Sequence, residues 1–276
     1  MFDNKYKKGL FVFVWVFFSF PAIAQNYEPN SDLRYESVVD FTASAEVIAH
    51  LEIVESIVVE AERSPNLADG FVRLYIEAAA IALLFGENSL DGNVRYLVDV
   101  QLGSDNRAPA LIGQRVLVFG RKVAGRPSDI QLVHHKAQQA YSPTLQQVVM
   151  SVVSDLGSSN KPPVITGIID AFSVPGNLTG ESETQIFLST VDGSPASLTV
   201  LRRPGRAPAW GVSWTEIIDR AAQPPEANTL EWYRLACSLP EQLPEAANQA
   251  QGRDSKAQAE RDYQMIMGEL GPCLRI

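Results

Sequence analysis

Three arginines stand close together around one predicted turn. Arg202 and Arg203 precede the Pro204-Gly205 pair, and Arg206 follows it. Guanidinium groups bind carboxylate and phosphate groups through paired hydrogen bonds, so the cluster could hold an external anion. Charged surface clusters more often pair within their own chain, and the sequence favours that interpretation. The acidic side chains considered as internal partners are Glu181, Glu183 and Asp219.

Two tryptophans follow the arginines. Trp210 and Trp214 fall on one face of the strand predicted over Pro208–Thr215, because side chains alternate along a strand. An exposed pair of indoles would form a platform for a sugar ring or an apolar protein surface. A later helix over the same face would make them core, and this interpretation is favoured because large aromatics dominate small cores. The candidate binding surface consists of Arg202, Arg203, Arg206, Trp210 and Trp214.

Glu181 and Glu183 flank Ser182 in the segment Gly180–Thr184, which reads GESET. A nucleophile elbow needs glycine where Thr184 stands and a helix after the serine, whereas a strand is predicted here. Two carboxylates in a cleft could instead act as an acid–base pair. The default prediction is a polar turn before a strand. A hydrolase acting on an envelope polymer through these residues is the alternative function.

The histidines give no metal or cofactor motif. His134 and His135 are adjacent, so their side chains on a strand point to opposite faces and cannot easily share one ion. His50 stands alone in another predicted strand. The sequence therefore predicts neither a metal site nor a bound cofactor.

The two cysteines, Cys237 and Cys273, both lie near the C-terminus. In an exported chain a single disulfide between them is the expected arrangement. Closing a loop of about 36 residues stabilises a fold by roughly 3–4 kcal/mol in the chain-entropy model. A catalytic cysteine is disfavoured, because no histidine lies near either one in the sequence.

Residues 1–24 are typical of a secretory signal peptide. Lysines open the segment, Leu10–Phe20 is apolar apart from Ser19, and Ala22-Ile23-Ala24 forms a cleavage site before Gln25. The apolar run is too short to span a bilayer, and no later stretch is long or apolar enough. We therefore expect a periplasmic or secreted protein with no membrane span after cleavage.

Charge narrows the range of partners. The chain carries a net charge of −9, and loss of the signal segment removes three lysines and one aspartate, which makes the mature chain more acidic still. Such a balance argues against nucleic acid or an anionic membrane surface as a general partner. An envelope protein or a glycan is the expected partner.

An antiparallel meander must position the arginines and tryptophans. Thr184–Val191 and Pro195–Arg202 are β-rich and joined across Asp192-Gly193, a strong hairpin signal. A two-residue turn there would place Phe187 opposite Leu198. Further strands are predicted over Ile165–Val174 and Pro208–Thr215, and helices over Trp214–Ala222, Thr229–Leu239 and Ala257–Leu270, with a loose segment at Glu245–Lys256.

The sequence of the first half of the chain predicts a small β-barrel. Five alternating runs separated by turn signals predict strands and a closed or half-closed β-barrel. Residues 44–157 form this domain together with a closing helix over Tyr141–Gly157, in which Ser142 caps and Pro143 opens the first turn. The predicted strands are Ser44–Glu60, Phe71–Phe85, Val94–Leu102, Arg115–Val123 and Asp129–His134.

The remaining boundaries follow from composition. Residues 25–43 are predicted to include a mobile N-terminal arm, because Gln25–Tyr35 is polar and rich in turn formers. Residues 158–163 form a linker, and residues 164–276 form a domain of meander and helices. The fold class is mainly β with α, that is, α+β: an antiparallel barrel-like domain followed by a meander packed with C-terminal helices.

Two parts of the sequence pattern resemble known groups of proteins. The Gly113-x-x-Val116-Leu117-Val118-Phe119 pattern resembles a later strand of OB-like barrels, although no helix is evident between the third and fourth strands. The mature chain also resembles exported alphaproteobacterial proteins of unassigned function, and that likeness implies no activity. The residues that carry it are Asp170-Ala171-Phe172, Pro175-Gly176, Gly180–Leu188 and Leu201–Gly205. The leading hypothesis is a non-enzymatic envelope binding or accessory protein.

Overall fold

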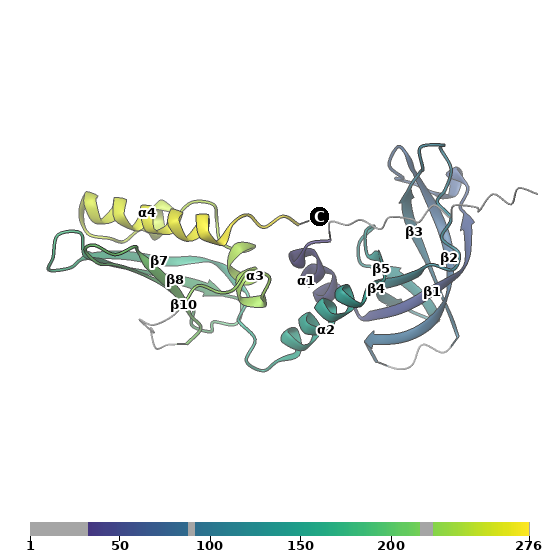
Figure 1. Ribbon diagram of the computed structural model, residues 1–276, viewed down its shortest axis with the longest axis horizontal. Helices are drawn as coiled ribbons and strands as arrows, with labels where there is room; N and C mark the ends of the chain where they lie inside the picture. The colour runs from purple at the N-terminus through teal and green to yellow at the C-terminus, as the bar shows by residue number, and fades with distance from the viewer. Residues whose placement is uncertain (1–32, 88–91, 216–222, 276) are drawn as a thin grey trace, which may run out of the picture.

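The computed structural model describes residues 33–87, 92–215 and 223–275. The molecule is elongated, with a barrel at one end, a second sheet at the other, and short helices between them (Figure 1). This mixed α+β architecture confirms the predicted fold class. The predicted signal peptide lies outside the described residues. In the described part of the chain, no helix has both the length and the apolar character needed to span a membrane.

Five strands close the N-terminal barrel. They pair in the order β1-β2-β3-β5-β4, and β4 returns to β1, so the sheet is continuous around the barrel. All pairings are antiparallel except that of β3 with β5. A short sixth strand pairs with the start of β4. The bounds are β1 Val47–Val58, β2 Phe71–Phe85, β3 Asn93–Gln101, β4 Arg115–Val123, β5 Arg126–Leu132 and β6 Gln138–Ala140, with a 3-10 turn at Ala61–Arg63.

Alternating apolar side chains fill the barrel. In β3, Val94, Tyr96, Val98 and Val100 point inward and are buried, while the residues between them are exposed or half-buried. Gly120 in β4 permits the strands to approach closely, because a Cβ there would lie only 2.0 Å from Ile130 Cγ2. The predicted alternation therefore corresponds to the observed inner face.

A helix occupies part of the predicted N-terminal arm. Helix α1 spans Tyr35–Ser44, and its Val39 and Phe41 are buried against the barrel, so the second half of the arm is a helix that was not predicted. Most of Gln25–Tyr35, the stretch expected to be mobile, lies outside the described residues. The Phe41 ring lies 5.6 Å from that of Phe119 and stacks at 5.4 Å on His134. The helix was missed because Arg34 occupies its N-cap without a capping side-chain bond, which removes the usual start signal.

Helix α2 links the barrel to the rest of the chain. It spans Pro143–Gly157, and Ser142 Oγ accepts a hydrogen bond from the Leu145 backbone N–H at 3.1 Å, as the predicted cap requires. Val149 and Val152 are fully buried on its inner face. The residues that follow, 158–164, are in neither a helix nor a strand.

The second sheet is an antiparallel meander in the order β10-β9-β8-β7. Helix α4 covers one face of it, and helix α3 lies at the end nearer the barrel (Figure 1). We call β1–β6 with α1 the barrel lobe, and β7–β10 with α3 and α4 the sheet lobe. The bounds are β7 Ile165–Pro175, β8 Ser182–Thr190, β9 Ser197–Arg202, β10 Ala209–Ser213, α3 Leu230–Ala236 and α4 Gly252–Leu270, with a 3-10 turn at Glu245–Ala247.

The register of the β8–β9 hairpin differs by one residue from the prediction. Phe187 pairs with Ser197, and Ile186 takes the place opposite Leu198. The connection is longer than two residues, because Pro195 has no N–H to extend the ladder and Ser194 N–H binds Asp192 Oδ1 at 3.1 Å. The slip turns Ile186 and Leu198 together toward the core.

Helix α3 lies within its predicted range Thr229–Leu239, helix α4 begins earlier than predicted, and a third predicted helix lies mostly outside the described residues. Helix α4 starts at Gly252, inside the segment expected to be loose, and Asn248 ties that segment to Lys256 O at 3.0 Å. The predicted helix Trp214–Ala222 falls mostly outside the described residues. The predicted disulfide is confirmed: Cys237 and Cys273 are bonded.

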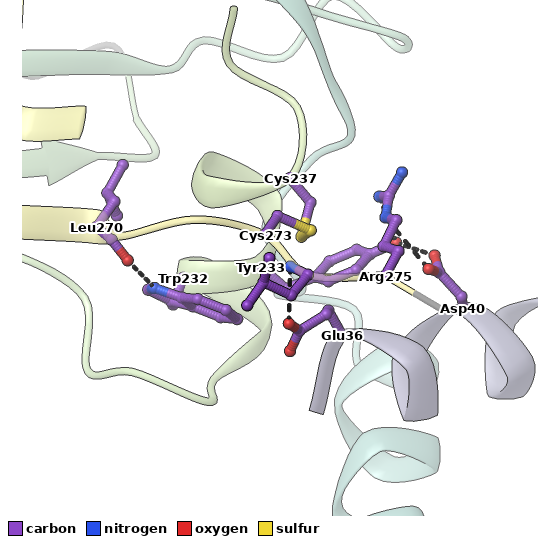
Figure 2. Close-up of a disulfide and its surroundings, with 9 residues drawn as sticks. Glu36, Asp40, Trp232, Tyr233, Cys237, Leu270, Cys273 and Arg275 are labelled. Carbon is purple, nitrogen blue, oxygen red and sulfur yellow. Dashed lines mark hydrogen bonds and ion pairs between the residues drawn. A yellow bond between two sulfur atoms is a disulfide. The ribbon is translucent and has the colours of Figure 1, made fainter. Parts of the chain in front are cut away.

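The disulfide lies where the two lobes meet (Figure 2). Asp40 of α1 accepts a hydrogen bond from Tyr233 Oη at 2.5 Å and pairs with Arg275 Nε at 3.2 Å. Trp232 Nε1 donates to Leu270 O at 2.8 Å, which joins α3 to the end of α4. The junction therefore combines a covalent bond with ionic and hydrogen bonds from both lobes.

Alkaline pH should weaken this junction. Burial, with a smaller effect of the hydrogen bond to Asp40, raises the pKa of Tyr233 from 10.0 to about 12. Its contribution to stability is thus complete below pH 10 and is lost as pH rises toward 12. Urea unfolding of wild type and Tyr233→Phe should show a stability difference that narrows by on the order of 1 kcal/mol over this range. Parallel stability curves for the two proteins would contradict the assignment.

Candidate functional site

The arginine cluster does not form one surface. Arg202 Nε lies 2.6 Å from Oδ1 of Asp262, a fully buried carboxylate on α4. Thr184 Oγ1 donates to the other oxygen of Asp262, and Gln258 Nε2 donates to Oδ1 at 2.9 Å. Arg202 is therefore a structural partner of a buried acid, whereas Arg203 and Arg206 are exposed at the turn beyond it.

The two tryptophans are also not a surface platform. Trp210 is only 4% exposed, and its Nε1 donates to Glu269 Oε2 on α4 at 2.5 Å. Trp214 is half-buried and packs on the same core. The covering element is α4, so the face of β10 that carries Trp210 is the inner face of the sheet.

Glu181, Ser182 and Glu183 line a surface hollow of about 700 Å³ together with Arg203. The carboxylates already have local partners. Glu181 Oε2 accepts the backbone N–H groups of Asn177 and Leu178 at 3.1 and 3.2 Å, and Glu183 Oε1 accepts Gln185 Nε2 at 2.8 Å. This is the geometry of a turn and a strand edge, and it does not place two carboxyl groups toward a common reacting atom.

The histidines lie in the barrel lobe and pack on other rings. The His134 and His135 rings are 4.0 Å apart, and His50 stacks on Tyr141 at 3.8 Å. Burial lowers the pKa of both His50 and His134. Within the described ranges, no three His, Cys, Asp or Glu side chains come together in a way that could hold a metal ion.

A larger hollow, of about 1130 Å³, lies on the barrel lobe, and we call it the barrel groove. It follows the seam where β3 meets β5, and the ladder there consists of one residue pair, Arg95 with Asp129. Tyr96 Oη donates to Gln138 Oε1 at 2.7 Å within the buried interior beside the seam. The barrel is thus closed by side chains where its backbone ladder is shortest.

Paired charges form part of the groove wall. Arg73 binds Asp99 through two parallel contacts, Nε to Oδ1 at 2.7 Å and Nη2 to Oδ2 at 2.8 Å, and this hydrogen bonding raises the pKa of Arg73. Asp129 is shared between Arg95 at 2.8 Å and Arg126 at 3.6 Å. One carboxylate therefore serves two guanidinium groups, and the groove as a whole is lined by the four arginines Arg63, Arg73, Arg95 and Arg126 against the three carboxylates of Glu60, Asp99 and Asp129.

Apolar side chains stand beside these charges. Ile57, Val58 and Leu97 are 48%, 55% and 50% exposed, although each belongs to a strand of a well-packed barrel. Arg63, in the 3-10 turn after β1, also lines the groove. An exposed apolar strip between arginines fits a ligand that has both apolar and acidic groups.

No protein-family model matches the chain, and no curated protein matches it. Function must therefore be inferred from the geometry of the chain's own residues.

The barrel groove was not predicted from the sequence. Its residues come from all five barrel strands and from the segments that follow β1 and β5, so no single stretch of sequence marks it. One local signal was available: Ile57-Val58-Val59 is an apolar run that breaks the alternation of β1 at its end. Such a run on a half-exposed strand indicates a surface that contacts something other than water.

Proposed function

We propose that this protein is a non-enzymatic binding or accessory protein of the cell envelope, and that it holds an extended segment of a partner polypeptide in the barrel groove. The observation that carries the proposal is the open edge of β3. This strand pairs with β2 along its whole length but with β5 only at Arg95. Among the described residues, the backbone from Leu97 to Gln101 has no strand partner on its other side.

An open strand edge can receive another strand. The outward backbone N–H and C=O groups supply hydrogen bonds to an added chain, and pockets for alternate side chains supply specificity. Leu97 points outward from β3, and Ile57 and Val58 also line the groove. An added strand would therefore place apolar side chains at every second position against this strip.

The charges favour a segment that also carries acidic residues. The Arg126 side chain is 71% exposed and shares the Asp129 carboxylate with Arg95, and Arg63 also lines the groove. The chain as a whole is acidic, so an acidic partner would be repelled elsewhere and directed to this surface.

Fold-level analogy supports a chain-like ligand. Small OB-type barrels bind chain-like molecules across their second and third strands, between flanking loops. The barrel groove uses β2 and β3 in the same way, together with the turn after β1 and the β4–β5 turn. The predicted signal segment and the disulfide both support an envelope or secreted location, because disulfides persist in oxidising compartments.

Selection of short displayed peptides on the mature wild-type protein would test the proposal. We expect selected sequences to alternate apolar and acidic residues. Leu97→Asp should weaken their binding by about tenfold or more, because it puts a charge on the apolar strip and repels acidic peptides. Hydrogen exchange should show that peptide binding protects backbone amides within Leu97–Gln101.

Val191→Asp is the matched control. Val191 is 70% exposed but lies on the sheet lobe, so the same substitution there should leave peptide affinity unchanged. Equal loss of binding in both variants would contradict the assigned site. Peptides that bind without protecting β3 would contradict strand addition.

A further inference from the structure

The C-terminal tail, residues 271–275, bridges the two lobes. It leaves the end of α4, reaches α3 through the Cys237–Cys273 bond, and continues to α1 (Figure 2). Both cysteine residues are partly exposed. The tail therefore joins elements that are more than 190 residues apart in the sequence, as the Tyr233–Asp40 contact beside it also does.

Two residues after the disulfide make the contacts with α1. The Leu274 backbone N–H donates to Glu36 Oε1 at 2.9 Å, and Glu36 is only 4% exposed. Arg275 Nε pairs with Asp40 Oδ2 at 3.2 Å, and its Nη2 donates to Tyr233 Oη at 3.0 Å. A buried carboxylate that loses its donor is costly, so the Leu274 contact matters to α1.

The position of the disulfide determines whether these contacts form. Cys273 immediately precedes Leu274, so the covalent bond to α3 holds the next two residues within reach of Glu36 and Asp40. Without it, ordering the tail would cost backbone conformational entropy for each residue that becomes fixed. The exposed Arg275–Asp40 pair contributes too little to offset that cost alone.

We propose that the disulfide is a redox-sensitive latch between the lobes. In the oxidised protein the tail is held on α1 and ties it to α3. A dithiol reductant opens the latch by exchange. One thiolate of the reductant attacks the sulfur of one cysteine and releases the other cysteine as a thiolate, which leaves a mixed disulfide. The second thiolate of the reductant then attacks its own sulfur in the mixed disulfide and releases the remaining cysteine as a thiolate. The reductant becomes a disulfide, and Cys237 and Cys273 become thiols, with two electrons transferred.

Opening is local under this proposal. Helix α1 keeps its apolar contacts, including Phe41 on Phe119 and Tyr35 against Trp232, so the lobes stay packed through their shared core. What is lost is the set of polar ties from the tail to Glu36 and Asp40. The first consequence is therefore faster opening of α1, not unfolding of either lobe.

Hydrogen exchange on the mature chain would test the latch, in the oxidised form and after reduction by dithiothreitol under native conditions. We expect exchange of α1 amides to rise by about tenfold or more, while amides of β4 and β8 keep their protection. Cys237→Ala with Cys273→Ala should reproduce this pattern. Unchanged exchange in α1, or an equal rise in all three elements, would overturn the proposal.

A second variant separates the latch from general effects of cysteine loss. Glu36→Leu with Asp40→Leu keeps the disulfide but removes both acceptor groups that the tail contacts, whereas amide replacements would still accept hydrogen bonds. We expect exchange in α1 to rise here too, and reduction to add little further. A large additional effect of reduction in this variant would show that the disulfide acts elsewhere, which would overturn the proposal.

Discussion

Replacing Arg202 with alanine is expected to lower the free energy of unfolding by about 3–5 kcal/mol, because it leaves a buried charge without its cation. Asp262 is completely buried, and Arg202 Nε contacts it at 2.6 Å. Thr184 and Gln258 also donate to the carboxylate but bring no positive charge. Urea unfolding of the mature chain would measure the loss as a lower midpoint at constant slope.

Arg203→Ala is the matched control. Arg203 is the next residue, has the same chemistry and is exposed, so its removal should change stability by no more than about 0.5 kcal/mol. A double replacement, Arg202→Leu with Asp262→Leu, should recover much of the loss because no unpaired charge remains. Equal small effects of both single alanine variants would show that the Asp262 pair does not stabilise the fold.

This pair of arginines shows what the local sequence could predict about the site. Internal pairing of the cluster is the interpretation that the sequence favours, but the partners that it suggests are Glu181, Glu183 and Asp219. The actual partner of Arg202 is 60 residues away on α4. Nothing in the alternation of β9 indicates which helix covers it, so the identity of a long-range partner is a property of the tertiary fold.

Strands were the most predictable elements. β2 and β4 have the predicted bounds, because the first half of β2 alternates, β4 is a short apolar run, and turn formers end both strands. The β8–β9 register was less predictable, since a single residue in a connection decides it. Pro195 and the Asp192–Ser194 contact lengthen that connection. The one-residue shift in register then places Ile186, and not Phe187, on the same face as Leu198.

The barrel groove was unpredictable for a different reason. It exists because the ladder between β3 and β5 stops after one residue pair. A sequence pattern shows which residues of a strand face inward, but it does not show where pairing between two distant strands ends. The open edge of β3 and the charges shared at Asp129 therefore become visible only when the barrel closes.

Phe41→Ala should destabilise the protein by about 3–5 kcal/mol, the usual cost of removing a buried phenylalanine. The Phe41 side chain is 4% exposed and packs against Phe119 and His134. If residues 35–43 did not pack on the barrel, the change would be near zero, so this variant tests directly whether α1 belongs to the core. Urea or thermal unfolding of the mature chain would measure the change.

Ser44→Ala is the control for Phe41→Ala, because Ser44 ends the same helix and is exposed. We expect it to change stability by no more than about 0.5 kcal/mol. If Phe41→Ala were equally neutral, α1 would not be part of the core. The proposed latch would then have nothing to hold, since the tail stabilises the junction only if α1 is itself fixed to the barrel through Phe41.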